Sequence, residues 1–347
     1  MESIGIDVHK VHSQVCIFTD DGEVLERGIC MEVDRFEKLL GGRPKARILI
    51  EASTESEWVA RSLENLGHEV VVVDPNFAAM YATRSRRVKT DRRDARTLAD
   101  ACRLGAYRPA HRLSEAQRHI RAELIVRESL VRTRTRYISV IRTLVRRDGL
   151  RVRSGSSDTF VDRLGEIDLP EVLRSEIAPL VALMEPLRDQ IQTCDARVEE
   201  RAKEDEVVRR LCTAPGNGPV TAAPFVATLD TAGRFERAHQ VEAYLGLVPR
   251  EMSSGEKQRK GRMTKAGNSR ARSLLMESAW CIMRWKKPET EELRTWAERI
   301  ARRRGKSKAA VALARRLAGI LYAMWRDGTE YTAQRAAVQT EESLVTT

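Results

Sequence analysis

Apolar positions in residues 1–80 switch between the spacing of strands and the three- and four-residue spacing of helices. A turn at Asp20-Asp21-Gly22 separates two of the strand-like runs. In chain order, the pattern predicts strands over 3–8, 13–18 and 23–30, a helix over 32–41, a strand over 46–53, a helix over 55–66 and a strand over 68–75.

Three strands followed by helix, strand, helix and strand is the element order of a ribonuclease-H-like α/β domain. A doubly wound dinucleotide-binding sheet would alternate from its start and carry a Gly-rich turn after its first strand. Here Asp7 is followed by Val8-His9-Lys10, which also argues against the phosphate loops of an actin-like sugar kinase. We therefore expect a ribonuclease-H-like (RuvC-like) domain at the N-terminus.

From residue 114 the pattern becomes helical. Residues 114–147 carry Arg between their apolar positions, and residues 170–211 carry acidic side chains there. We predict that these two helices pair as an antiparallel coiled coil, with the Gly-rich segment 149–160 near the turn. The expected fold class is α/β plus α, with a RuvC-like domain (1–110), a helical coiled-coil linker (111–210), a mainly helical domain (211–330) and a flexible tail (331–347).

Charge is strongly segregated along the chain. The 347 residues carry a net charge of +11. Residues 1–80 hold 8 basic and 15 acidic side chains, 81–160 hold 21 and 8, 161–210 hold 8 and 13, and 211–347 hold 24 and 14. Two basic blocks of this size are typical of a protein that binds a polyanion, most commonly nucleic acid. An Arg-rich surface that serves only solubility is the alternative.

Composition argues against several other classes. No stretch approaches the ~18 uncharged apolar residues of a membrane span, and the chain does not open with a signal-peptide pattern. The six cysteines are scattered without a Cys-x-x-Cys pair, which favours reduced thiols in a cytoplasmic protein over a zinc ribbon. No histidines have metal-ligand spacing on a predicted helix, so we do not expect a His-based zinc site.

Four carboxylates occupy positions that favour a shared site. Asp7 ends the first predicted strand and Glu51 ends the fourth, and apolar strands seldom carry a charge without a function. In the ribonuclease-H order these strands are neighbours, so the two carboxylates would lie side by side. Asp91 and Asp94, in K-T-D-R-R-D-A-R at 89–96, would share one face of a helix.

Converging carboxylates suit hard divalent cations, and we expect two Mg²⁺ ions there. Metals ~3.5–4 Å apart would contact the attacking and leaving oxygens of a phosphodiester. For Asp91 and Asp94 alone, surface ion pairing is the simpler explanation, whereas the ordered set of four favours a metal site. The basic side chains expected to guide a phosphate backbone are Arg84, Arg86, Arg87, Lys89, Arg92, Arg93 and Arg96.

The C-terminal half contains two further Gly-rich segments. L-C-T-A-P-G-N-G-P-V-T-A-A at 211–223 resembles a helix-hairpin-helix turn, in which Gly216 and Gly218 would present N–H groups to phosphate. An ordinary turn between helices explains it equally well.

After Pro249 a basic loop begins, and it contains Ser253 and Ser254. A serine there either attacks phosphorus with help from a base or cations, or donates hydrogen bonds to phosphate, and spacing alone favours the second. The loop's basic side chains expected to contact nucleic acid are Lys257, Arg259, Lys260, Arg262 and Lys265.

These motifs together resemble a known family. G-I-D-V-H-K, I-E-A-S and K-T-D-R-R-D-A-R are similar to the RuvC-like domain of DEDD insertion-sequence transposases, the IS-one-ten family. P-G-N-G-P-V-T-A, A-Y-L-G-L-V-P, S-G and R-M-T-K-A-G-N resemble the transposase domain of that family. The resemblance implies that Ser254, which precedes Gly255, is the nucleophile rather than Ser253. It also implies the metal ligands Asp7, Glu51, Asp91 and Asp94.

The resemblance further implies a function. Such a protein is a DNA recombinase that excises and inserts a mobile element through a 5′-phosphoserine intermediate, guided by a structured non-coding (bridge) RNA that pairs with donor and target DNA. It works as a dimer or tetramer in a prokaryotic cytoplasm, near the nucleoid. The alternatives are a RuvC-like metal-dependent DNA junction endonuclease that uses water, with Ser254 structural, and a nucleic-acid-binding scaffold without catalysis.

Overall fold

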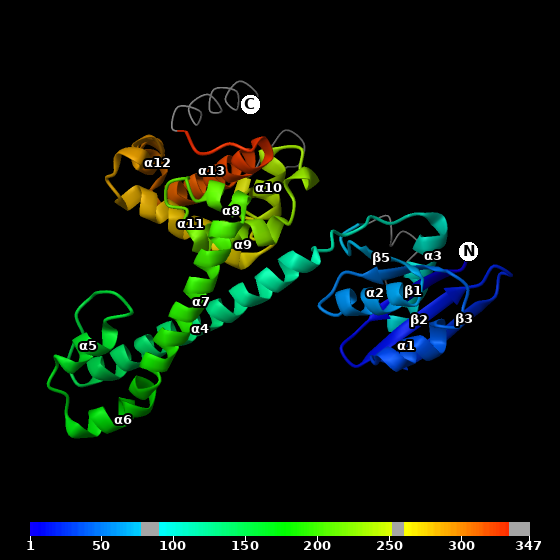
Figure 1. The fold of residues 1–347 in the computed structure, drawn as a ribbon, viewed down its shortest axis with the longest axis horizontal. Helices are drawn as coiled ribbons and strands as arrows, with labels where there is room; N and C mark the ends of the chain where they lie inside the picture. Colours follow the sequence, from blue (N-terminus) through cyan, green and yellow to red (C-terminus); the bar gives the residue numbers. More distant parts are fainter. Residues whose placement is uncertain (78–89, 252–259, 333–347) are drawn as a thin grey trace. The chain divides into compact units, whose positions relative to one another are not determined.

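The structure of the chain, a computed structural model, describes residues 1–77, 90–251 and 260–332. It divides into two compact units, Met1–Leu113 and Ser114–Thr347 (Figure 1). The finer division into four parts stays a prediction. In the described ranges, no helix has both the length and the apolar character needed to cross a membrane.

The first unit is built on a five-stranded sheet in the order β3-β2-β1-β4-β5. β1 pairs antiparallel with β2, and β2 with β3, whereas β1, β4 and β5 run parallel. This mixed sheet confirms the predicted element order and is consistent with the ribonuclease-H-like expectation. The elements are β1 Ser3–Val8, β2 His12–Phe18, β3 Val24–Cys30, α1 Val33–Leu40, β4 Arg47–Glu51, α2 Ser56–Asn65, β5 Glu69–Val73 and α3 Asp91–Leu104.

Side chains of the central strands point alternately to the two faces of the sheet, and helices cover both faces. Ile4 and Ile6 of β1 lie in one buried cluster with side chains of α1 and α2, such as Phe36 and Leu63. On the opposite face, Leu49 of β4 packs with Leu98, Ala101 and Cys102 of α3. Because successive side chains of a strand point to opposite faces, Gly5 and Asp7 share the α3 face.

Gly5 allows α3 to lie directly on β1. A Cβ at this position would be 2.2 Å from the carbonyl oxygen of Ala95 and 2.3 Å from the backbone nitrogen of Ala99. Both atoms belong to the helix backbone, which cannot rotate away as a side chain would. The glycine in the first strand therefore sets how closely α3 approaches the strand that ends in Asp7.

In the second unit, a long helix pairs with a later one. Ion pairs join Arg127 to Asp195 and Glu123 to Arg201, so α4 and α7 run in opposite directions (Figure 1). The far end of α4 packs against α5 and α6 through Ile141, Phe160 and other side chains of a separate buried cluster. The bounds are α4 Glu115–Arg147, α5 Phe160–Gly165, α6 Glu171–Ala182, α7 Met184–Glu204 and α8 Glu206–Leu211.

The prediction of a single helix over 170–211 is wrong, because three helices cover this range. The first break follows Ala182, four residues before Pro186. Proline has no N–H to donate to the carbonyl of Ala182, so an uninterrupted helix would lose a bond there. The second break is at Asp205, whose side chain accepts hydrogen bonds from the N–H groups of Val207 and Val208 and so caps α8.

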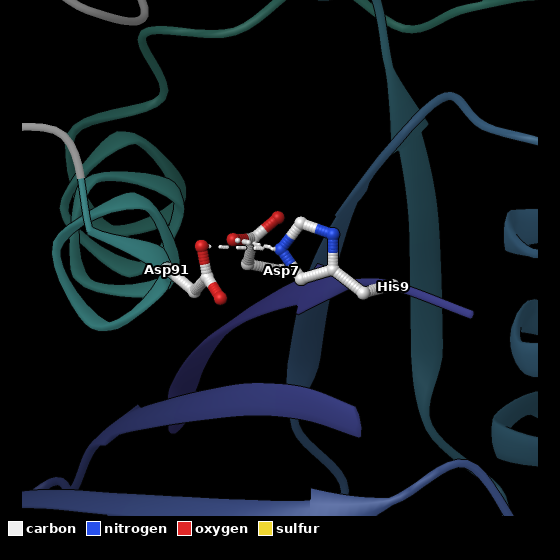
Figure 2. A group of neighbouring side chains, drawn as sticks. All are labelled: Asp7, His9 and Asp91. Carbon is white, nitrogen blue, oxygen red and sulfur yellow. Dashed lines mark hydrogen bonds and ion pairs between the residues drawn. The ribbon is translucent and has the colours of Figure 1, made fainter. Parts of the chain in front are cut away.

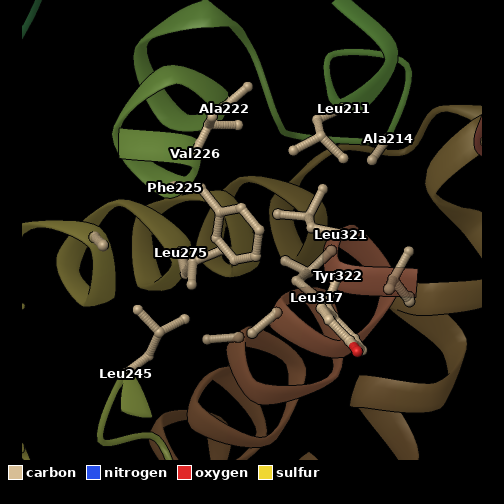
Figure 3. Packing of buried hydrophobic residues seen from close by; sticks show 14 of the residues in the cluster. Leu211, Ala214, Ala222, Phe225, Val226, Leu245, Leu275, Leu317, Leu321 and Tyr322 are labelled. Atoms are coloured by element: carbon tan, nitrogen blue, oxygen red, sulfur yellow. The ribbon is translucent and has the colours of Figure 1, made fainter. Parts of the chain in front are cut away.

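The remaining helices pack around α13, an apolar helix near the C-terminus. Leu317, Leu321 and Tyr322 of α13 are buried against Phe225 of α9 and Leu275 of α11 (Figure 3). The elements are α9 Pro219–Leu229, a 3₁₀ turn at Ala232–Arg234, α10 Ala238–Tyr244, β6 Pro249–Glu251, β7 Lys260–Met263, α11 Ser269–Arg284, a 3₁₀ turn at Pro288–Thr290, α12 Glu291–Arg304 and α13 Lys306–Asp327.

Candidate active site

The end of β1 and the start of α3 bring three potential metal ligands together. His9 Nε2 lies 3.1 Å from Asp7 Oδ2 and 3.3 Å from Asp91 Oδ1. Figure 2 shows the three side chains pointing toward one another, with Asp91 on the first turn of the helix. One ligand atom from each residue lies within 4.8 Å of the others. The predicted convergence of Asp7 and Asp91 is therefore present.

Local sequence explains why α3 begins at this site. The Thr90 side chain accepts a hydrogen bond from the N–H of Arg93, which caps the helix. Asp91 and Asp94 then fall in the first turn, where the positive end of the helix dipole favours negative charge. Asp91 is exposed, whereas Asp94 is buried between the helix and the sheet.

Glu51 and Asp94 lie near the three-residue cluster but outside it. The parallel register pairs Ile6 with Ile50, so Asp7 and Glu51 follow at the ends of adjacent strands. Glu51 shares the face of Leu49, which is the α3 face. Asp94 is close enough to Asp7 to affect its titration. The atoms within 4.8 Å of one another come from Asp7, His9 and Asp91, and neither Glu51 nor Asp94 is among them.

The site concentrates negative charge in a partly buried position. Burial raises the pKa of Asp7 above its usual value of 3.8, and the charges of Asp94 and Asp91 raise it further. His9 acts in the opposite direction and lowers the pKa of Asp7. A cation placed among these carboxylates would relieve the same repulsion, so the donor set fits a divalent metal.

His9 is the site residue that sequence reasoning missed. It does not lie on a helix with a second histidine, so metal-ligand spacing gave no signal. The available signal was its position two residues after Asp7, because residues at this spacing share a face when a strand continues. Its imidazole contacts both carboxylates, which suits a residue that orients metal ligands, since hard cations prefer oxygen.

The basic residues of the first unit that were predicted to guide phosphate lie partly on α3 and partly outside the described residues. Arg92 is ion-paired with Glu26 of β3, and Arg96 lies 3.8 Å from the same carboxylate. These arginines link α3 to the edge strand of the sheet, and 70% of the Arg92 side chain stays exposed. Arg93 also lies on α3. The others, Arg84, Arg86, Arg87 and Lys89, lie outside the described residues.

The proposed phosphate turn at Gly216 and Gly218 lies between α8 and α9. Gly216 has a φ of +70°, and a Cβ there would be 3.1 Å from the carbonyl oxygen of Ser278. The buried Asn217 donates a hydrogen bond to the carbonyl of Leu211, which closes the turn. Gly218 precedes the first turn of α9, and a Cβ there would meet nothing within 4 Å. The turn has a structural role at Gly216, and phosphate binding by it stays a prediction.

The serine loop belongs to an antiparallel hairpin. Strands β6 and β7 enclose residues 252–259, which the structure does not describe. Ser253, Ser254, Lys257 and Arg259 therefore lie outside the described residues. Lys260 begins β7, while Arg262 and Lys265 are exposed on and after that strand.

Comparison with known proteins decides the family. A family model described as "Transposase IS116/IS110/IS902 family" matches residues 208–294, and a transposase model of the DEDD IS110 type matches residues 4–147. A probable family 20 transposase from Pseudomonas aeruginosa is 32% identical over 304 residues, covering 83% of this chain and 86% of that protein. The chain belongs to the IS110/IS116/IS902 family of transposases.

Other relatives of this transposase align over nearly its whole length. The transposase for insertion sequence element IS1111A from Coxiella burnetii is 27% identical, over 92% of this chain and 88% of its own. The transposase for IS1328 from Yersinia enterocolitica is 25% identical, over 95% and 98%. The chain is thus an insertion-element transposase, a DNA-processing enzyme, and its DEDD-type match covers the unit that contains Asp7, His9 and Asp91.

Proposed function

We propose that this transposase carries out Mg²⁺-dependent DNA strand exchange through a phosphoserine intermediate. The observation that carries the proposal is the meeting of the Asp7 and Asp91 carboxylates at one partly buried point. The metal ligands would be Asp7, Glu51, Asp91 and Asp94. Together they would bind two Mg²⁺ ions when DNA is present. When bound, Mg²⁺ supplies charge neutralisation and Lewis acidity at the phosphodiester.

Ser254 is the nucleophile in this proposal. Its Oγ forms a bond to the phosphorus of the scissile phosphodiester while the bond from phosphorus to the 3′ oxygen breaks. The serine proton passes to that oxygen, which leaves a 3′-hydroxyl and a 5′-phosphoserine. Attack by the 3′-hydroxyl of another strand then restores the serine and completes the exchange without an external energy source.

The chain's own basic residues would position the DNA. Arg262 and Lys265 are exposed on and after β7, which follows the serine loop in the chain, and they would pair with phosphates on either side of the reacting bond. Arg92 and Arg93, at the start of α3, would do the same near the carboxylates. The carboxylates and the serine belong to different units. The family resemblance implies a dimer or tetramer that brings together sites from different copies, and this is part of the proposal.

The metal half of the proposal is tested by Asp7→Asn and Asp91→Asn, with Asp34→Asn as the matched control. Asp34 is an exposed aspartate on α1, paired with Lys38. Each site variant should lose strand cleavage by at least about 10³-fold in Mg²⁺, because charge stabilisation at the reacting phosphate is lost. Affinity for DNA should change little. Cleavage by Asp7→Asn at the wild-type rate would contradict the assignment.

The serine half is tested by Ser254→Ala beside Ser253→Ala. Wild type and Ser253→Ala should form a covalent protein–DNA adduct that survives denaturing electrophoresis, whereas Ser254→Ala should form none. Intact cleavage by Ser254→Ala with no adduct in any variant would instead support the water-using junction endonuclease. A protein with no Mg²⁺-dependent cleavage at all would support a non-catalytic scaffold.

A structured guide RNA is the last part of the proposal, and the family resemblance is its support. The basic segment 81–160 offers charge for a phosphate backbone of either nucleic acid. Sequencing of RNA that co-purifies with the protein should recover one defined transcript from beside its gene. Recovery of only bulk cellular RNA would contradict guidance by RNA.

A further inference from the structure

A cavity of about 520 Å³ lies in the second unit between four helices. Its walls come from α4, α9, the last residue of α10 and the start of α11. This volume is in the range of about 300–1,000 Å³ that small-molecule sites have, and it is too small for a duplex. The charged side chains that line it are Arg121, Glu128, Arg132 and Arg270.

A buried carboxylate holds two of these arginines. Glu128 is 8% exposed, its Oε2 is 3.5 Å from Arg270 Nε, and its Oε1 pairs with Arg132. The pair with Arg270, whose side chain is 23% exposed, adds little to stability, because removing the charges from water offsets their attraction. It does orient the Arg270 guanidinium, whereas 71% of the Arg132 side chain is exposed. With three arginines against one glutamate, the cavity keeps a positive excess that suits a phosphate.

Another wall of the cavity is apolar rather than charged. Ile125 is 56% exposed and Tyr244 is 38% exposed, although both are large apolar side chains. The Tyr244 ring is held by Phe235, at 5.4 Å between ring centroids, and by Arg234, 5.1 Å from its centre. A fixed aromatic ring beside arginines is the pattern that stacks unpaired bases.

The cavity also lies at the base of the hairpin that carries the serine loop. A Cβ on Gly267 would be 2.0 Å from the carbonyl oxygen of Tyr244, so the chain entering the hairpin and the chain leaving it touch at this wall. Arg272 Nη1 donates hydrogen bonds to the carbonyls of Leu245 and Ala266, at 2.9 and 2.7 Å, and closes the base. The cavity wall and the base of the hairpin are therefore in direct backbone contact.

We infer that this cavity binds one unpaired nucleotide of the DNA strand on which the Ser254 loop acts. Arg132 and Arg270 receive its phosphate, and its base lies against Ile125 and Tyr244. The assignment of DNA rests on the proposed function, because the adjoining hairpin carries the proposed nucleophile for DNA. Holding a nucleotide out of the duplex beside that hairpin would fix the register of the strand and leave the neighbouring phosphodiester accessible.

The test compares Ile125→Glu with Val126→Glu in the full chain. Val126 is the neighbouring residue on α4, is 57% exposed and does not line the cavity, so its variant introduces the same charge at a similarly exposed position outside the cavity. The probe is a fluorescent DNA duplex with one bulged nucleotide, beside its fully paired counterpart, in buffer without Mg²⁺. Wild type and Val126→Glu should prefer the bulged probe. Ile125→Glu should bind it about tenfold more weakly and bind the paired probe unchanged.

A second variant tests the phosphate contact. Arg270→Gln should also weaken the bulged probe about tenfold, whereas Arg284→Gln, at the other end of α11, should not. Equal binding of the bulged probe by wild type, Ile125→Glu and Arg270→Gln would overturn the inference. A loss confined to a bulged RNA probe would overturn the assignment of DNA. Asp7→Asn should lose cleavage and keep the bulge preference, so failure of the catalytic proposal would be seen as wild-type cleavage by Asp7→Asn with the bulge preference still intact.

Discussion

Replacement of Gly5 by alanine should separate the two halves of the acidic site. The added methyl would lie 2.2 Å from Ala95 O, 2.3 Å from Ala99 N and 2.8 Å from Leu98 Cβ. Ordinary contacts begin at 3.4 Å, so α3 must move from β1 by about 1 Å, or the strand must bend. Because α3 carries Asp91, its contact through His9 to Asp7 on β1 changes by a similar amount.

Two consequences can be given magnitudes. Overpacking of a well-packed core costs about 1–3 kcal/mol of folding free energy. A displacement of reacting groups by about 1 Å can lower a catalytic rate by roughly 10²-fold. We therefore expect Gly5→Ala to be folded, less stable and strongly impaired in strand cleavage, with DNA affinity nearly unchanged.

The assay combines cleavage rates with hydrogen–deuterium exchange of peptides from α3. Gly42→Ala is the control, since a Cβ at Gly42 meets nothing within 4 Å in the same unit. Faster exchange in residues 91–104 together with slow cleavage is expected for Gly5→Ala alone. If Gly5→Ala cleaves DNA like Gly42→Ala and its α3 amides exchange at the wild-type rate, close approach of helix and strand does not position the site.

Three further predictions concern the same site and the α8–α9 turn. Because the pKa of Asp7 is raised in the folded chain, this group favours folding only at low pH, and that contribution is lost as pH rises through its folded pKa. Asp7→Asn should therefore have a higher Tm than wild type at pH 7 without metal. Added Mg²⁺ should raise the Tm of Asp7→Asn less than that of wild type, and an equal rise in both proteins would exclude Asp7 as a ligand. His9 lowers the pKa of Asp7, so His9→Ala should move the acidic limb of the cleavage–pH profile to higher pH, and an unmoved limb would exclude this role. Gly216→Ala should lower the free energy of unfolding by about 1–2 kcal/mol, because its φ is +70°, whereas Gly218→Ala should be neutral in thermal unfolding; equal effects would contradict the structural role of Gly216.

The order of the elements in the first unit follows from the sequence because each has a clear hydrophobic period. The predicted strands over 3–8 and 68–75 correspond to β1 and β5, with ends that differ by at most two residues. Strand order was predictable as well, since the element sequence resembles one known arrangement. The helix over 170–211 was not predicted correctly, because its apolar spacing continues across a break that the missing N–H of Pro186 helps to impose.

Some residues of the candidate site could likewise be predicted from the sequence, and others could not. Asp7 and Asp91 could be selected from sequence, because a charge at the end of an apolar strand and one in a capped first turn are local signals. His9 had only its spacing from Asp7 as a local signal, because its contact with Asp91 exists only once α3 has docked. The cavity by Arg270 was equally hidden, since its walls come from segments far apart along the chain.

Most of the elements, the family and the acidic residues worth testing can be predicted from the sequence, because they depend on local periodicity and on short motifs. How close these residues come depends on the tertiary structure. The approach of α3 depends on a missing side chain at Gly5, and the cavity depends on the contact between Gly267 and Tyr244. Distances of this kind are set by backbone packing between distant segments, and no local pattern records them.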